Sequence, residues 1–130
     1  MDPRYLEHFQ APRGVGDLAR PTARVEVENP VCGDQLTLAL RVEGERVVEL
    51  AWRVRGCSGA IAAASALHER VRGRTLAEAH GLGPAALEEL LGPLPPLKRH
   101  GLELALDGLR AALISAAAGA AHDEHQGESA

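Results

Sequence analysis

Hydrophobic and polar residues alternate along three segments of the chain. In residues 23–28, 35–42 and 47–54, every second residue is aliphatic or aromatic. A period of two is typical of strands that bury one face and expose the other. The sequence Glu-Gly-Glu-Arg at 43–46 separates the second and third segments. We therefore expect an antiparallel hairpin there and a small, mainly antiparallel three-stranded sheet overall.

Apolar residues at helical spacing predict the remaining elements. We expect helices over residues 2–10, 56–73, a short stretch from Thr75, residues 84–91 and residues 102–121. Thr75 and Glu78 have the spacing of a capping box, which supports a helix start at that point. These elements predict an α+β fold with helices packed on one face of the sheet and a long C-terminal helix.

The chain has the length of a single domain. We place that domain at residues 1–120 of the 130 and expect the polar residues 121–130 to form a disordered tail. The net charge of −4 and the lack of a basic block argue against a nucleic-acid partner. No apolar run has the length of a membrane span, and the N-terminus lacks a signal-peptide core. We therefore expect a cytoplasmic protein without a membrane partner.

Four residues that could carry chemistry lie where the predicted elements end. Cys32 and Asp34 are two residues apart at the start of a strand, Cys57 opens a helix, and His100 precedes the last helix. The positive end of a helix dipole favours the thiolate, the form of cysteine that binds metals. In a reducing compartment, a disulfide between the two cysteines is not expected, and metal binding or thiolate chemistry is favoured.

Each of these residues also has an ordinary structural interpretation. A free cysteine is often a small, buried core residue. Asp34 follows a glycine and could simply form a turn, and His100 could be a surface or capping residue. His8, His68 and His80 fall on predicted polar helix faces and need no special role. A Cys-x-Asp pair without a Cys-x-x-Cys motif does not by itself establish a metal site.

The order of several motifs resembles the IscU/NifU-type iron–sulfur scaffold family from about Tyr5 to Leu113. The first cysteine loop and the second cysteine with its helix both match that family's pattern. A proline segment also matches it, with Leu97 where valine is usual. The motifs that carry the resemblance are "HFQAPRGVGDL", "NPVCGD", "RGCSGAIAAASALHERVRGRT", "TLAEA" and "LPPLKRHG".

The resemblance implies a non-enzymatic scaffold or carrier for iron–sulfur clusters. In this family, three cysteines, an aspartate and often a histidine surround one exposed site. A cysteine desulfurase delivers sulfur there, a transient [2Fe-2S] cluster forms with iron, and the cluster passes to apo iron–sulfur proteins. Zinc occupies the same ligands in many isolated members. By resemblance, the ligands here are Cys32, Asp34, Cys57 and His100, which we expect to converge on one exposed point.

The proline segment resembles the site that an Hsp70-type chaperone grips in many family members. Its residues are Leu94, Pro95, Pro96, Leu97 and Lys98. Consecutive prolines favour polyproline geometry, so we expect this segment to be extended and accessible for docking. The alternative is a stiff connector that keeps two helices apart.

One position departs from the family pattern. Gly101 stands where the family has its third cysteine, directly after the histidine. Two thiolates, an imidazole and a carboxylate still make a four-ligand set for zinc, and they could also hold a labile cluster. The metal remains open. The alternative function is an interaction module that docks on a desulfurase or chaperone and binds zinc or no metal. We also expect that Gly101→Cys would cost little stability and would tighten metal binding.

Overall fold

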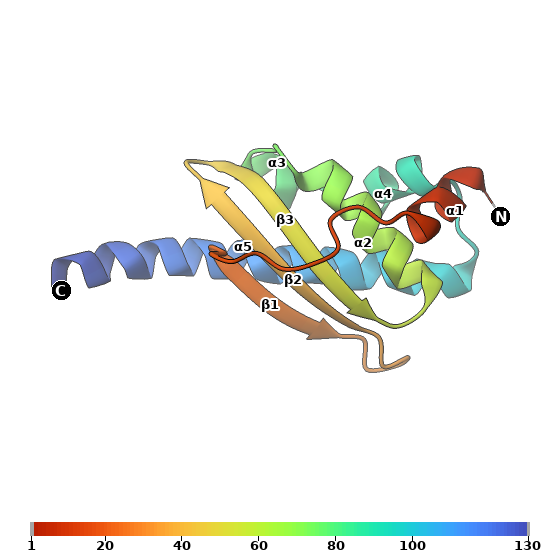
Figure 1. Cartoon of the computed structure of the whole chain (residues 1–130), viewed down its shortest axis with the longest axis horizontal. Helices are drawn as coiled ribbons and strands as arrows, with labels where there is room; N and C mark the ends of the chain where they lie inside the picture. The colour runs from red at the N-terminus through yellow and green to blue at the C-terminus, as the bar shows by residue number, and fades with distance from the viewer. Residues whose placement is uncertain (1, 130) are drawn as a thin grey trace.

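The computed structural model describes the backbone of residues 2–129 and the side chains of residues 2–118. Its helices lie on one side of a sheet of three strands (Figure 1). In chain order the elements are α1 (Pro3–Gln10), β1 (Ala23–Glu28), β2 (Gln35–Glu43), β3 (Arg46–Arg55), α2 (Ser58–Val71), α3 (Leu76–His80), α4 (Pro84–Leu91), the 3-10 turn η1 (Pro96–Lys98) and α5 (Arg99–Ser129).

The three strands form an antiparallel meander in the order β1-β2-β3. Leu38 lies opposite Val25 on one side and Trp52 on the other, which places the alternating apolar residues of all three strands on one face. Helix α5 packs on β1 and β2 and runs behind the sheet, while α2 contacts β3 and α5 (Figure 1). The predicted α+β fold is confirmed.

The core between sheet and helices is aliphatic and closely packed. Leu36, Leu38 and Leu40 of β2 are buried against leucines of α5, among them Leu102 and Leu109. The half of α2 that faces the core is rich in alanine, and small side chains allow neighbouring backbones to approach closely. The chain can therefore build its core with only two aromatic residues, Tyr5 and Trp52, and its one phenylalanine, Phe9, is exposed.

The connection from α1 to β1 covers part of the outer edge of β3. The backbone N–H of Trp52 donates to the carbonyl of Gly14, and the backbone carbonyl of Trp52 accepts from the N–H of Gly16, both at 2.9 Å. The connection rejoins the sheet where Thr22 donates its N–H to Leu40 O at 2.7 Å. The edge of β3 is thus paired at Trp52 by a short segment that runs parallel to it.

The proline segment is the main departure from the predicted elements. Pro96–Lys98 forms one 3-10 turn that leads directly into α5, which begins at Arg99 and not at residue 102. A proline fits the first position of a helical turn because the N–H that it lacks would have no partner there. Pro95 keeps the extended geometry (φ −64°, ψ 156°), whereas Pro96, Leu97 and Lys98 form the turn, and Leu94 is buried. The prediction of an extended segment is therefore wrong for Pro96–Lys98, and the predicted accessibility is confirmed for Pro95, Pro96 and Leu97 but not for Leu94.

The histidine environments also differ from the prediction of polar faces. His8 is buried, and its Nδ1 lies 2.7 Å from the hydroxyl of Ser65 in α2. Burial lowers the pKa of His8, and the neighbouring Glu69 opposes this shift in part. Burial likewise lowers the pKa of His68, whose Nδ1 has no hydrogen-bond partner in the described part of the chain. Histidine tolerates such sites because its neutral form carries no charge to desolvate.

The structure leaves the predicted disordered tail and domain boundary untested. The backbone of the expected disordered tail, residues 121–130, continues α5 as far as Ser129, and its side chains lie outside those described. Its disorder and the domain boundary at residue 120 remain predictions. Among the described residues, the structure holds no helix with both the length and the apolar character that a membrane crossing requires.

Candidate metal centre

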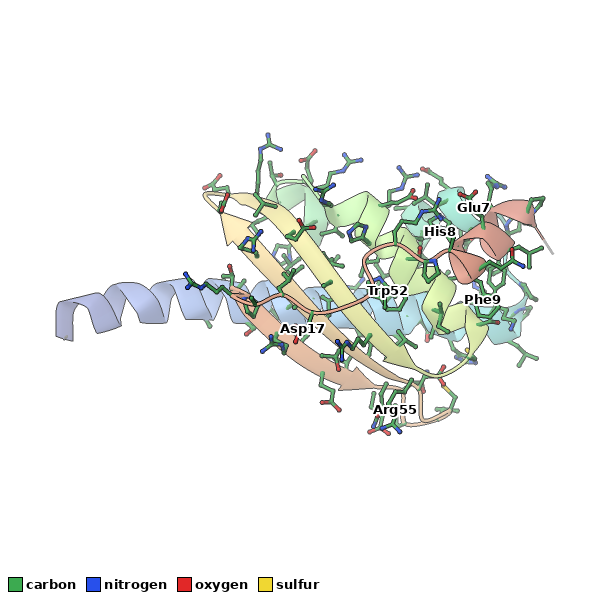
Figure 2. All side chains as sticks on the ribbon, viewed as in Figure 1. Glu7, His8, Phe9, Asp17, Trp52 and Arg55 are labelled. Atoms are coloured by element: carbon green, nitrogen blue, oxygen red, sulfur yellow. The ribbon has the colours of Figure 1, made fainter. Side chains whose placement is uncertain are left out.

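The two cysteines lie at the same end of the sheet because of the strand register. Gln35, the first residue of β2, pairs with Arg55, the last residue of β3. Cys32 precedes that pair in the loop between β1 and β2, and Cys57 follows it as the N-cap residue of α2. Figure 2 shows Arg55 beside the tip of the β1–β2 loop. Antiparallel pairing therefore brings two sequence-distant thiols to one edge of the molecule.

Among the described residues, Asp34 and Cys57 form the one hydrogen bond within the predicted ligand set. The Cys57 thiol Sγ lies 3.3 Å from Asp34 Oδ2, and Asp34 is 7% exposed. Gly56 makes this approach possible, because a Cβ at that position would lie 2.5 Å from Asp34 Cγ. The carboxylate thus occupies the space beside the thiol that a side chain at position 56 would fill.

The loop that carries Cys32 is held by its own backbone. Asn29 donates its N–H to Asp34 O at 2.8 Å and accepts the N–H of Gly33 at 2.7 Å. The Asn29 side chain also accepts the N–H of Val31 at 2.9 Å. Gly33 has φ +76°, which a side chain would strain, so glycine is required at this turn. Cys32 is exposed at the tip of this closed loop.

His100 lies in the first turn of α5 and is exposed. Within residues 2–118, no group of three or more His, Cys, Asp and Glu side chains is arranged to hold a metal ion. The structure thus joins Asp34 with Cys57, and it leaves Cys32 and His100 as exposed residues without a contact to that pair. Convergence of all four ligands on one point remains a prediction.

The expectation that a cysteine at position 101 would cost little is wrong. Gly101 is buried, and a Cβ there would lie 2.5 Å from Gly59 C and 2.7 Å from Ala60 N. These are backbone atoms of α2, which cannot rotate away as a side chain can. Position 101 therefore faces the helix–helix contact between α5 and α2. The adjacent residues in the sequence, His100 and Leu102, do not indicate that position 101 faces another helix.

Ser58, next to Cys57, has a structural role that sequence reasoning missed. Its Oγ lies 2.7 Å from the hydroxyl of Tyr5 and accepts a hydrogen bond from Lys98 Nζ at the same distance of 2.7 Å. One hydroxyl thereby links α1, the start of α2 and the proline segment. The bond also ties Lys98, a predicted docking residue, to the residue after a predicted ligand.

Comparisons with known proteins give consistent matches. Residues 2–120 match the family model described as "NifU-like N terminal domain". The chain is 44% identical over 112 residues to the "Bifunctional protein NifU/MnmA" of Rubrobacter xylanophilus, covering 85% of this chain and 23% of that protein. It is 38% identical over 111 residues to "Iron-sulfur cluster assembly scaffold protein IscU 1" of Archaeoglobus fulgidus, covering 85% of this chain and 72% of that protein.

A further relative and a solved structure extend these matches. The chain is 35% identical over 114 residues to the "Iron-sulfur cluster assembly scaffold protein IscU" of Haemophilus influenzae, covering 85% of this chain and 90% of that protein. The crystal structure of a NifU-like protein (N-terminal) from Brucella abortus superposes with a TM-score of 0.73 at 23% identity, covering 88% of this chain and 92% of that one. At 23% identity, this similarity shows that the two chains share a fold and supports no further conclusion.

Proposed function

Because the chain belongs to the NifU-like N-terminal domain family, we propose that it is an iron–sulfur cluster assembly scaffold or carrier. Three observations support this: the match over residues 2–120, the relatives named as such scaffolds, and the cysteines at one end of the sheet. The contact between Asp34 and Cys57 carries the proposal, since it places a sulfur and an oxygen ligand side by side.

The distance within that pair suits two ligands of one metal ion. With metal–sulfur and metal–oxygen bonds of about 2.3 and 2.0 Å and a tetrahedral angle, the two ligand atoms should be about 3.5 Å apart. The observed separation of Sγ and Oδ2 is 3.3 Å. A shift of a few tenths of an ångström would therefore admit iron or zinc. Cys32 and His100 supply the remaining two ligands in this proposal, both of them from exposed positions.

The donor set suits a cargo that is held briefly. Thiolates are the preferred ligands of iron–sulfur clusters, and carboxylate oxygen is a harder donor. With two cysteines in the whole chain, one protomer can offer at most two thiolates to a [2Fe-2S] cluster. A cluster held in this way should leave readily for an apo iron–sulfur protein. The chain's contribution is to hold and present the cluster, and no residue is assigned a catalytic step.

Partners are implied by the same proposal. A cysteine desulfurase would deliver sulfur to the exposed thiols, and an Hsp70-type chaperone would bind the proline segment. Exposure of Pro95, Pro96 and Leu97 supports chaperone binding, and Leu97 is 81% exposed. Leu94, which is buried, and Lys98, which bonds Ser58, are not free for such a contact in this conformation. The docking surface is therefore narrowed to the three exposed residues.

Anaerobic reconstitution tests the function. The protein is mixed with ferrous iron, cysteine, a desulfurase and an excess of a thiol reductant such as dithiothreitol, which reduces the persulfide sulfur to sulfide. The visible absorption band is then quantified against iron and sulfide content. We expect a stoichiometric cluster that Cys32→Ser or Cys57→Ser abolishes and that His100→Ala makes more labile. His80→Ala is the matched control, because His80 is an exposed histidine on α3, away from the sheet end. A cluster that survives both cysteine substitutions would refute the proposed ligands.

The second candidate is a docking module that binds zinc or no metal. The burial of Gly101 against α2 favours it, because position 101 offers no open direction for a third thiolate. The same reconstitution separates the two candidates. A protein that stays colourless, retains zinc and still binds the desulfurase supports the module and refutes the scaffold.

A further inference from the structure

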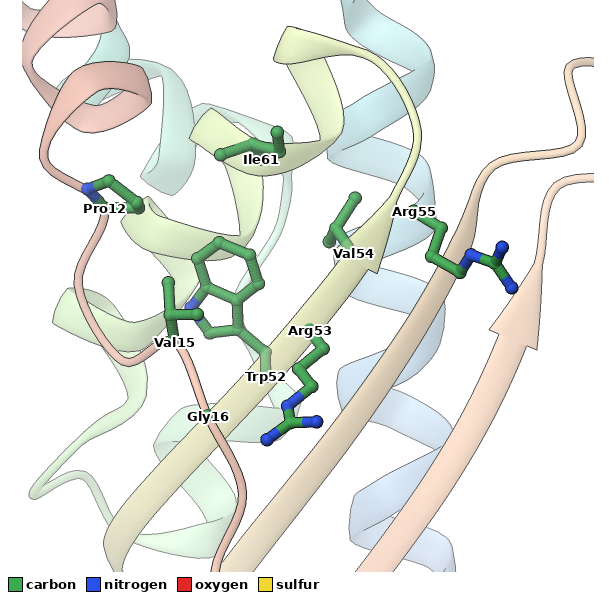
Figure 3. A pocket seen from close by; sticks show the side chains of 8 residues that line it. All are labelled: Pro12, Val15, Gly16, Trp52, Arg53, Val54, Arg55 and Ile61. Carbon is green, nitrogen blue, oxygen red and sulfur yellow. The ribbon is translucent and has the colours of Figure 1, made fainter.

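A cleft of about 580 Å³ lies along the outer edge of β3, beside the paired segment at Trp52. Apolar side chains from three parts of the chain line it. Figure 3 shows Trp52, Val15 and Ile61 bordering the cleft; Arg53 lies beside β3 near Gly16, and Arg55 reaches across the neighbouring strand β2. The cleft is thus apolar on one side and cationic along the strand that forms its edge.

The backbone at this edge offers an unused donor and acceptor. In an antiparallel ladder, residues two apart direct their N–H and C=O groups to the same side. Trp52 directs these groups outward to Gly14 and Gly16, so Val54 also directs its groups outward. Within residues 2–129, no backbone hydrogen bond from a turn, loop or neighbouring segment reaches Val54. One residue of β3 next to the cleft therefore remains open to a further strand.

The charges beside this edge also lack direct partners. Arg53 and Arg55 are exposed and make no ion pair or side-chain hydrogen bond with another residue among those described. Arg53 helps to lower the pKa of Asp17 through its charge, but the direct partner of Asp17 is Arg24. The two arginines occupy the strand face opposite to Trp52, because side chains alternate along a strand. Acidic side chains are the complementary partners.

We propose that this edge of β3 docks an extended segment of a partner protein in which apolar and acidic residues alternate. The segment pairs with the N–H and C=O of Val54, as the residues around Val15 pair with Trp52. An apolar side chain enters the cleft between Trp52 and Ile61, and its acidic neighbours reach Arg53 and Arg55. Adding a strand to an open sheet edge is an established mode of peptide recognition.

A second copy of this chain fits the edge less well than a separate partner. The one described strand with the required alternation is β1, with Val25, Glu26, Val27 and Glu28. Val25 and Val27 already pack against the protein's own core and cannot enter the cleft of a neighbour without leaving it. Because Arg55 lies two residues before Cys57, a docked partner would be held beside the candidate metal centre.

A peptide titration tests the proposal without any metal. The probe is acetyl-Val-Glu-Val-Glu-Val-amide, and Trp52, the single tryptophan, reports on binding through its fluorescence. We expect saturable binding that weakens at least tenfold in the double variant Arg53→Glu, Arg55→Glu. The control is Arg20→Glu, Arg41→Glu, which has the same charge change away from the cleft and should bind as the parent does. Far-UV circular dichroism verifies that both variants are folded.

A second probe tests the backbone contribution on the unaltered protein. The same peptide with every amide N-methylated cannot donate to Val54 O, and it should bind at least tenfold more weakly. The proposal is overturned if the parent does not bind the first peptide, if the methylated peptide binds equally well, or if the Arg53 and Arg55 variant binds as the parent does. The proposal is also overturned if sedimentation shows concentration-dependent dimers of the parent that the Arg53 and Arg55 variant does not form. In that case a second copy of this chain, and not a separate partner protein, occupies the edge of β3.

Discussion

Substitution of Gly101 by alanine is the sharpest test of the contact between α5 and α2. Gly101 is the third residue of α5, where α5 crosses the start of α2. The added Cβ would lie 2.5 Å from Gly59 C and 2.7 Å from Ala60 N, and it would also overlap Gly59 O. Relaxation must move one helix against the other by several tenths of an ångström or more, because no rotamer change can relieve contacts with backbone atoms.

Two opposing effects set the magnitude. Replacing glycine by alanine inside a helix stabilises it by up to about 1 kcal/mol. Overpacking of a closely packed contact costs about 1–3 kcal/mol, and the upper end applies where backbone must move. We therefore expect the free energy of unfolding to fall by about 1–2 kcal/mol, which corresponds to a decrease in Tm of roughly 4–8 °C for a chain of this size.

Urea unfolding followed by circular dichroism measures this difference directly. Gly108→Ala is the control, because it makes the same change in the same helix but meets the flexible end of Leu36, with Cδ2 at 2.6 Å. It should be less destabilising than Gly101→Ala. A Gly101→Ala protein as stable as the parent would show that position 101 does not contact the α2 backbone. Gly101→Cys would then become a sensible way to restore a third thiolate.

Three further predictions concern titration, ligand placement and docking. Burial lowers the pKa values of His8 and His68, so the folded protein binds fewer protons than the unfolded chain. The free energy of unfolding should therefore be greatest above about pH 6.5 and decrease at lower pH. Urea midpoints on either side of that pH measure this, and a parent protein without the decrease would contradict the prediction. Gly56→Ala should displace the Asp34 carboxylate from Cys57 and speed cluster or zinc loss to a chelator roughly tenfold, whereas Gly83→Ala, with nothing within 4 Å of its Cβ, should not. The double variant Pro95→Ala, Pro96→Ala should keep the Tm of the parent, because it leaves the hydrogen bond between Lys98 and Ser58 in place. Calorimetry should show that it no longer binds the chaperone. Unchanged binding would mean that the prolines only connect two helices.

The strands and their faces could be predicted from sequence because periodicity reports directly on burial. The structure buries Leu36, Leu38 and Leu40, as their alternation predicted, although Ala39 between the last two is buried as well. The capping box at Thr75 and Glu78 is also present as predicted, since both of its hydrogen bonds are local. Patterns that depend on a few neighbouring residues therefore predicted the structure well.

The wrong predictions for His8 and Gly101 share a physical cause, which is contact between distant segments. The burial of His8 depends on Ser65 in another helix, and the burial of Gly101 depends on Gly59. No periodicity in one segment reveals the side chains that the other segment places against it. The prediction for the proline segment failed for a local reason: Pro96 occupies the start of a 3-10 turn, which the fixed φ of proline fits as well as it fits extended geometry. For the candidate site, the sequence suggested four ligands whose convergence stays a prediction, and the strand register explains why Asp34 meets Cys57.

The order of elements in this fold has a consequence during synthesis. The three strands end at Arg55, whereas α5, which covers β1 and β2, begins only at Arg99. At about 5–20 residues per second, the ribosome takes roughly 2–9 s to make the intervening chain. For those seconds the leucine face of the hairpin lacks its covering helix, and it is an apolar sheet surface open to other nascent chains. The interval before α5 emerges is therefore when this protein is most exposed to aggregation in the cell.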